Sequence, residues 1–502
     1  MAKYIYENIK KDYEGFYNPI VYVYVSEKDI VHDKNSNYSI SELSVDLSCE
    51  YKANIATFTI SGALDEENKY FDVDAAKNYI MIGSSVRILM GYGIKVTEVF
   101  RGYIARVAFT YESNPSVTSG INITAMDVKG IMMSNNYSKR MTSSYYSDAV
   151  SEIFNQTVYQ NLVNSGIVSQ YLVSATPDKP GAAAGGSAGD LGGLSDAGGL
   201  GGATDMTGGL GGAADMTGGL GGLAGGAGGF GAGGVESDTP AKRIEMTSES
   251  DYDFIVKAAK KFGYEFFSLG SYVYFRKAKE NAEVLLQIDQ TCNIFSYNIE
   301  YDITGLVGSV EVRGVDVDKG SVVKSKVKNT NKLSLGSKAK SLISSQTKVY
   351  IDSSTDTKEA ADIRANSIME DMSYRLGSLE MLIIGIPELL PGSYVEISGI
   401  GSAISNKFYI TEVEHFFDLD GNFKTKLYGK AASLPQDGAS GIGLGGDLGL
   451  DSDLMSGLDS VTSGLDELSS GLDELSEGAD ELSSGYDALN SGMDILSGGL
   501  NF

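Results

Sequence analysis

The chain has 502 residues, which exceeds one ordinary domain and predicts two to four folded units. Its formal net charge is −26, but fourteen of its 66 Asp and Glu residues lie in residues 436–502 and six in residues 181–240, and neither tract contains Lys or Arg. The rest of the chain therefore has a formal charge of only −6. This balance argues against direct nucleic-acid binding, which needs a basic surface, and no nucleic-acid site is predicted.

The cysteines and the N-terminus say little about chemistry but something about location. Cys49 and Cys292 share no CxxC spacing and have no metal partners nearby in sequence, so both are predicted to be small core residues. The polar N-terminus lacks a signal-peptide core, and no run of eighteen apolar residues occurs. We therefore expect synthesis in the cytoplasm without a signal peptide or transmembrane segment, and export only within a particle.

After an N-terminal arm at residues 1–17, apolar and polar residues alternate in short runs separated by turns. This alternation predicts antiparallel strands at 20–26, 44–47, 56–61, 85–90, 96–100, 102–110 and 121–127. We expect a closed or nearly closed barrel over residues 18–135, because closure removes exposed sheet edges. The helical segment 136–177 follows. Its apolar residues recur at three- and four-residue steps from Ser147-Asp148 onward, which predicts one amphipathic helix, with apolar positions Ala149, Val150, Ile153, Phe154, Val158 and Leu162.

Residues 178–240 are a glycine-rich insert. A ten-residue repeat within it begins at Leu200, Leu210, Leu220 and Phe230. Glycine loses the most backbone entropy on folding, so this composition predicts a flexible insertion loop. The regular spacing of Leu and Met leaves a second interpretation open, in which these side chains dock on a partner. A phosphate-binding loop is not indicated, because a preceding strand and a Gly-Lys-Ser/Thr ending are both missing.

A linking element at 241–283 and a second β unit at 284–434 follow the insert. Apolar spacing predicts a helix over residues 251–262 with short strands at 264–267 and 272–276. The second unit is predicted to contain a helix at 357–376 and strands at 294–301, 307–315, 322–327, 382–386, 394–398, 408–416 and 423–427. The segment 418–422 is too short for a calcium loop, so we expect a hairpin turn in which Asp-Gly supplies the positive φ.

The last tract, residues 435–502, has apolar residues at alternating three- and four-residue steps, which is a heptad pattern and predicts a coiled coil, possible as a trimer. The candidate oligomerisation positions are Leu454, Leu458, Val461, Leu465, Leu468, Leu472, Leu475, Leu482, Leu489 and Leu496. A glycine precedes each first heptad position, and each such glycine destabilises a helix by about 0.5–1 kcal/mol relative to alanine. An isolated helix should therefore be largely unfolded, and association with other copies must stabilise it. A disordered acidic tail is the alternative, since the carboxylates are crowded and no lysine offsets them.

Residues with catalytic potential are sparse. The two histidines, His32 and His415, have no recognisable cysteine or serine partners, and His415 is interpreted as structural. The paired carboxylates of the acidic tracts lie in solvated sequence, where nothing separates their pKa values. No catalytic residue, cofactor or metal site is predicted, and the chain is not expected to be an enzyme.

Four phrases of the chain are Gly91-Tyr92 with Val99-Phe100-Arg101-Gly102, Ser248-Glu249-Ser250-Asp251-Tyr252-Asp253-Phe254, Leu390-Pro391-Gly392 and Tyr409-Ile410-Thr411-Glu412-Val413-Glu414-His415. They resemble the hub proteins of contractile phage tails, including the late-control type, and the related valine-glycine-repeat (VgrG) spikes. Their order and spacing over roughly residues 18–434 carry the resemblance. It implies a mainly β fold of two tube-like barrels with small α/β linking elements. It also implies that Glu249 and Asp251 are capping and first-turn acids of a helix that packs against the barrels.

The resemblance further implies a structural hub in the baseplate of a phage tail, tailocin or extracellular injection particle. In that family three chains with two barrels each form a pseudo-sixfold ring, so a homotrimer adapts the hexameric inner tube to a threefold spike. The implied partners are the tail tube protein, a separate spike or tip protein, other baseplate proteins, and a tape-measure protein or cargo. A hub with a cell-wall-degrading activity and a glycine-rich surface adhesin are the alternatives, and an adhesin would need a signal sequence or anchor.

Overall fold

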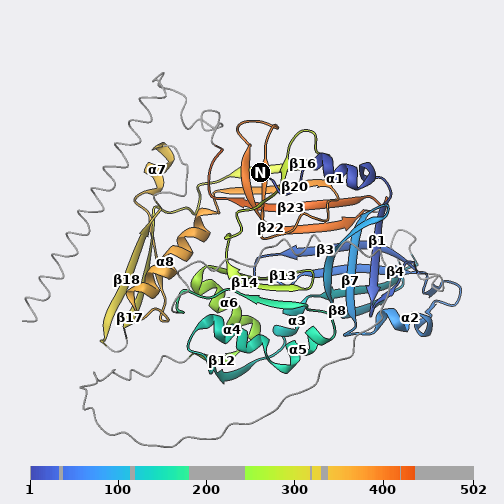
Figure 1. The fold of residues 1–502 in the computed structure, drawn as a ribbon, viewed down its shortest axis with the longest axis horizontal. Helices are drawn as coiled ribbons and strands as arrows, with labels where there is room; N and C mark the ends of the chain where they lie inside the picture. The colour runs from blue at the N-terminus through green and yellow to red at the C-terminus, as the bar shows by residue number, and fades with distance from the viewer. Residues whose placement is uncertain are drawn as a thin grey trace, which may run out of the picture. The chain divides into compact units, whose positions relative to one another are not determined.

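The computed structural model of the chain describes residues 2–32, 38–113, 119–179, 244–316, 319–329, 337–418 and 420–435 (Figure 1). These residues all belong to one compact unit, Met1–Leu444. The predictions for the glycine-rich insert and for the C-terminal heptads lie outside the described residues, so they stay predictions.

A thirteen-stranded sheet dominates the fold and confirms the mainly β class. Its strands are β1 (Pro19–Val25), β2 (Lys28–Asp29), β3 (Ser39–Ser48), β4 (Ile55–Ser61), β7 (Ser85–Tyr92), β8 (Lys95–Thr110), β9 (Gly120–Met126), β15 (Val284–Ile288), β16 (Ile294–Tyr301), β20 (Gly377–Ile384), β21 (Tyr394–Ile397), β22 (Asn406–Phe417) and β23 (Phe423–Ala431). The strand order is β16-β20-β23-β22-β3-β4-β9-β8-β7-β1-β2, and β21 pairs with both β22 and β15. Two predicted strands, 96–100 and 102–110, are one long strand, β8.

The two predicted β units are joined edge to edge. The first half of β22 pairs with β21, and its second half pairs with β3, from Glu412 opposite Ser48 to Phe416 opposite Ser44. One sheet therefore passes through both units. Within the described residues, the series of paired strands ends at β16 on one side and at β2 on the other, and neither unit closes into a separate barrel.

One face of this sheet covers a single hydrophobic core that both units share. Val45 and Ile123 from the first unit and Val413 and Leu427 from the second are all buried in it. Along β23 buried and partly exposed residues alternate without a break. This period-two pattern is typical of an antiparallel sheet with one face on the core and one facing solvent. The N-terminal arm, α1 (Tyr6–Asp12) and a 3₁₀ turn at Glu14–Phe16, adds side chains to the same core. A β5 (Leu64–Asp65) and β6 (Tyr70–Phe71) hairpin with α2 (Val73–Ile80) lies between β4 and β7 in the chain.

The segments on the two sides of the glycine-rich insert form one α/β element with its own core. It consists of α3 (Val128–Met132), β10 (Tyr137–Arg140), α4 (Tyr146–Phe154), α5 (Thr157–Asn164), β11 (Gln170–Val173), β12 (Glu245–Glu249), α6 (Asp251–Phe262), β13 (Tyr264–Leu269) and β14 (Tyr272–Lys277). Pairing of β10 with β12 and of β11 with β14 crosses the insert. The single helix predicted from Ser147 was wrong: Gln156 is extended, at φ −64° and ψ 148°, and divides it into α4 and α5, which leaves Val158 43% exposed.

The chain leaves the main sheet for two longer segments: the α/β element between β9 and β15, and residues 302–376 between β16 and β20. We call these two segments excursions. The second excursion contains β17 (Ser309–Asp316), β18 (Ser321–Lys328), α7 (Ser337–Ile343), β19 (Thr347–Ile351) and α8 (Lys358–Ser373). The predicted strands 307–315 and 322–327 belong here, in a separate three-stranded sheet ordered β18-β17-β19, and not to the sheet of the second β unit. Because Tyr301 at the end of β16 lies opposite Gly377 at the start of β20, the excursion begins and ends at neighbouring points.

Candidate functional site

Residues of the tail-hub phrases meet where the first β unit, the linking element and the second β unit join. We call this place the junction and define it by Cys49, β13–β14, the Pro391-Gly392 turn and the middle of β22. The backbone N–H of Cys49 donates to the carbonyl of Thr411 at 3.1 Å, which ties the end of β3 to β22. The Tyr409 and Gly392 positions of the phrases also lie here, as their contacts show.

A buried ionic network holds the junction together. The Nε of Arg276 in β14 donates to Glu265 in β13 at 2.7 Å, and both side chains are 5% exposed. The same guanidinium donates to the carbonyl of Gly392 at 2.7 Å, and the hydroxyl of Tyr409 donates to Glu265 at 2.5 Å. Burial raises the pKa of Glu265, but Arg276 and Tyr409 both stabilise its carboxylate form. One pair of charges thus connects β13 and β14 to two segments of the second β unit, the Gly392 turn and β22.

Glycine is required at position 392 for two reasons. Its φ is +83°, a backbone conformation that costs other residues about 1–2 kcal/mol. A Cβ added there would also lie 2.8 Å from the terminal nitrogen of Arg276 and 3.0 Å from the ring of Phe267. The Leu390-Pro391-Gly392 phrase is therefore explained by close packing of a turn onto the linking element.

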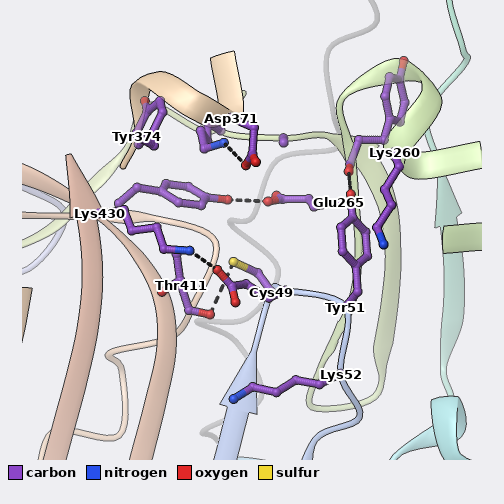
Figure 2. A pocket seen from close by; sticks show the side chains of 14 residues that line it. Cys49, Tyr51, Lys52, Lys260, Glu265, Asp371, Tyr374, Thr411 and Lys430 are labelled. Carbon is purple, nitrogen blue, oxygen red and sulfur yellow. Dashed lines mark hydrogen bonds and ion pairs between the residues drawn. The ribbon is translucent and has the colours of Figure 1, made fainter. Parts of the chain in front are cut away.

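A pocket of about 480 Å³ opens at the junction (Figure 2). Its lining is rich in lysine, tyrosine and acidic side chains: Cys49, Glu50, Tyr51, Lys52, Lys260, Tyr264, Glu265, Ala278, Lys279, Asp371, Tyr374, Tyr409, Thr411 and Lys430. Most of these charges are paired across the junction. Lys430 binds Glu50, Lys52 binds Glu412 at 2.5 Å, and Lys279 lies 3.8 Å from Asp371. The pairs connect the first unit to the second and the linking element to α8.

Cys49 at this pocket is not suited to nucleophilic chemistry. It is buried, and burial, with Glu265 as the next contribution, raises the pKa of its thiol well above the ordinary value. Reactive cysteines need the thiolate, which forms in electropositive and accessible surroundings. Cys292 is also free and buried, so both cysteines are core residues, as the sequence predicts.

The seam between β22 and β3 carries like charges. Glu414 lies directly opposite Asp46. Burial, followed by Glu414 and Glu412, raises the pKa of Asp46 to about 6. Ser44 donates a hydrogen bond to Glu414 at 3.2 Å and Lys52 opposes part of the repulsion at Asp46. Carboxylates directly opposite each other destabilise an antiparallel pair, so this seam is held by its core face and not by its charges.

The helix acids implied by the resemblance have different roles in detail. The cap of α6 is Ser250, whose side chain accepts from the N–H of Asp253, and not Asp251 or Glu249. Asp251 is a first-turn acid as expected, but it is also fully buried and accepts from the hydroxyls of Tyr137 at 2.6 Å and Tyr159 at 2.5 Å. It therefore fixes α6 to β10 and α5. Glu249 binds Lys257 at 2.5 Å.

The remaining predicted positions are structural. His415 is fully buried between the hydroxyl of Thr425 at 2.9 Å and the carbonyl of Leu389 at 3.1 Å, and burial lowers its pKa to about 4. The 418–422 segment is the β22–β23 turn: Asp418 accepts from the N–H of Asn422, and Gly421 has a φ of +77°. In the described ranges we find no cluster of three or more His, Cys, Asp or Glu side chains able to hold a metal, and no helix long and apolar enough to cross a membrane.

Sequence reasoning missed the Glu265–Arg276 pair, although a signal was present. Both residues interrupt short apolar strands that flank the Gly270 turn, and counting outward from that turn places them opposite each other. Opposite charges at facing positions of two buried strands indicate a buried ion pair.

Comparison with solved structures confirms the expected resemblance at the level of the fold. The tail protein from Neisseria meningitidis MC58 matches with a TM-score of 0.51 at 12% identity, over 84% of this chain and 98% of that one. The 43 kDa tail protein of prophage MuSo2 from Shewanella oneidensis matches with a TM-score of 0.51 at 11% identity, over 83% of this chain and 99% of that one. The chain therefore has the β-rich fold of phage tail proteins.

Comparisons of sequence add little. A family model described as the Alg8 N-terminal domain matches residues 235–418, which is less than half of the chain. That stretch includes β12 without its partner β10, and β22 without its partners β3 and β23, so it does not correspond to one folded piece. A comparison with curated proteins finds no match.

Proposed function

We propose that this chain is a structural, non-catalytic hub of a phage tail, tailocin or injection-particle baseplate. Three copies form an adaptor that joins the hexameric inner tube to a central spike. The fold shared with two phage tail proteins supports a structural role in a tail or baseplate. The adaptor role rests on the sheet that passes through both β units.

The β22–β3 seam is the observation that carries the proposal. It places two β units side by side in one sheet, with a shared core on one face and a polar face on the other. Three such chains present six units around an axis, which suits a threefold assembly facing a sixfold tube. The two ends of the pairing path, β16 and β2, are sheet edges that neighbouring copies can cover.

The first experiment is the absolute mass of the full-length chain in solution, measured by light scattering over a concentration series. A mass of three chains supports the proposal. A monomer at every concentration, also after addition of the tube and spike proteins of the same particle, would overturn it. Zymography on cell-wall material separates the alternative of a hub with lytic activity, which requires clearing by the purified chain.

An edge variant tests how the copies meet. Asn298 is exposed on the edge strand β16, and lysine there disfavours pairing with another strand. We expect Asn298→Lys to shift the mass toward one chain. Ser378→Lys is the matched control, because Ser378 is exposed on β20, opposite Glu300 and inside the sheet. Equal masses for both variants would remove β16 from the interface.

The C-terminal heptads enter the proposal as an axial bundle. Deleting residues 451–502 is expected to weaken trimerisation or tip assembly while far-UV circular dichroism keeps the β signal. Loss of the whole β signal would contradict this assignment. Deleting residues 181–234 is expected to leave the fold intact if the insert serves as a loop.

A further inference from the structure

The 302–376 excursion has one face that the described part of the chain leaves uncovered. Its sheet packs α8 against one side (Figure 1). Val310 and Val312 of the sheet and Ala365 and Met369 of α8 belong to one buried cluster there. The opposite side of the sheet, which we call the outer face, consists of Glu311, Arg313 and Val315 in β17, Val322, Lys324 and Lys326 in β18, and Val349 and Ile351 in β19.

The attachment of the excursion leaves the outer face directed away from the linking element. The side that carries α8 is the attached side: the guanidinium of Arg364 in α8 donates to the carbonyl of Lys260 in α6, and Ser367 packs beside Gly263. Lys261 donates to the carbonyl of Ser354 at 3.2 Å in the same region. The three-stranded sheet is thus held from one side, and among the described residues its other side keeps Val322 and Ile351 exposed.

The outer face combines positive charge with exposed apolar side chains. Ile351 is 87% exposed and Val322 69% exposed. Val322 lies opposite Val315, and Lys324 lies opposite Arg313. Like charges at facing positions lower the stability of a sheet, as they do at the Asp46–Glu414 seam. The one acid of the face, Glu311, already accepts from Arg313 at 2.5 Å.

The sequence from β18 to β19 is strongly basic. Residues 319–348 contain eight lysines and no Asp or Glu, whereas the chain outside the two acidic tracts has a formal charge of −6. Lysines on the edge strand β18 also discourage unwanted strand pairing, which is their ordinary structural role. That role does not explain the exposed Val322 on the same strand or the exposed Ile351 on the opposite edge strand β19, since exposed apolar side chains on an edge promote association.

We infer that the outer face is a docking surface for an acidic protein segment that also presents apolar side chains. Carboxylates of the partner would meet Lys324 and Lys326, and its apolar side chains would cover Val322 and Ile351. A phosphate backbone offers no apolar complement, so the mixed character of the face favours protein over nucleic acid. The face lies outside the main sheet, so the inference goes beyond the adaptor role and does not depend on the number of copies in the ring.

The test uses the full-length chain and a fluorescein-labelled peptide that alternates glutamate with valine. Two comparison ligands have the same charge without the apolar component: the peptide with serine in place of valine, and a short DNA duplex. Fluorescence anisotropy at several salt concentrations gives the affinities. We expect the valine peptide to bind more tightly than either comparison ligand, with an affinity that falls as salt rises.

Substitutions then locate the site. Lys324→Glu with Lys326→Glu should weaken binding of the valine peptide by about tenfold or more. Ile351→Ser should weaken the valine peptide but not the serine peptide. Lys77→Glu with Lys277→Glu changes the net charge equally at two exposed lysines elsewhere and should leave the affinity unchanged. Circular dichroism checks that each variant folds.

Three results would overturn the inference. One is equal affinity for the valine peptide in the Lys324/Lys326 variant and in the control variant. Another is tighter binding of the DNA duplex, which would make the face a nucleic-acid site. A third is peptide-independent self-association that the Lys324/Lys326 substitutions abolish, which would make a second copy of the chain the occupant.

Discussion

Asp46 offers a direct test of the seam between the two β units. Its carboxyl lies opposite Glu414, and burial, then Glu414 and Glu412, raise its pKa from 3.8 to about 6. That difference corresponds to at most about 3 kcal/mol. Because the side chain is only partly buried, solvent screening reduces the effect to about 1 kcal/mol. Asp46→Asn keeps the shape of the side chain and removes the charge.

The sign of the effect depends on pH. The folded-state pKa lies above that of the unfolded chain, so the folded state holds the proton more firmly. The contribution of Asp46 to stability therefore falls as the pH rises from about 4 to about 6, and then stays level. We expect Asp46→Asn to raise the free energy of unfolding by about 1 kcal/mol at pH 7.5 and to leave it unchanged at pH 4.

Urea unfolding across this pH range measures the effect. The chain contains no tryptophan, so far-UV circular dichroism is the reporter. Asp420→Asn removes an equal charge from an exposed residue of the β22–β23 turn and serves as the control. A variant that is less stable than the wild type at pH 7.5, or a gain that is the same at pH 4 and pH 7.5, would refute the electrostatic account of the seam.

Two further predictions concern buried polar groups. Arg276→Met leaves the carboxylate of Glu265 buried without its cation and should lower the free energy of unfolding by about 3–5 kcal/mol. Circular dichroism should show this as a lower thermal midpoint. An unchanged midpoint would show that the pair does not hold the junction. Burial lowers the pKa of His415 to about 4, so the wild type loses stability as the pH falls from about 6.5 toward 4, where the unfolded chain takes up the proton. His415→Gln should remove this part of the acid sensitivity in urea unfolding at pH 4.5 and 7, and an identical pH dependence would count against a neutral buried histidine.

The sequence predicted the local elements of the β units well because their signal is local. Alternating burial along β9 and β23 and the Asp-Gly turn of the β22–β23 hairpin follow from patterns within a few residues. The strand predicted at 382–386 covered only the end of β20, which begins at Gly377. The helix predicted over Asp251–Phe262 has bounds identical to α6 because its apolar spacing is local, although its cap is Ser250 and not one of the two acids that the resemblance implied. The predicted helix after Ser147 failed at Gln156, since apolar spacing alone does not detect a change of backbone conformation between two short helices.

Long-range pairing was beyond the reach of the sequence. Nothing in β3 or β22 indicates that Asp46 lies opposite Glu414, because their like charges argue against this register. The shared apolar face decides the register, since a slip of one residue would turn the buried Val45 and Val413 to the polar side. For the same reason the strands at Ser309–Asp316 and Ser321–Lys328 were assigned to the second unit, although they pack on α8 in a sheet of their own.

The main sheet and the 302–376 excursion differ in how strongly their contacts restrict their residues. The main sheet must keep its register through the seam, and its phrase residues, such as Gly392 and Tyr409, are fixed by close contacts inside the junction. The 302–376 excursion leaves and rejoins that sheet at paired positions, Tyr301 and Gly377, so its outer residues can change without disturbing the register. A basic, partly apolar surface such as the one around Lys324 can therefore be matched to a partner while the sheet stays constant. Three of the four phrases that resemble tail hubs accordingly lie in the main sheet or the junction, and the fourth lies at β12 and the start of α6, whereas the acid-free lysine run lies in the excursion.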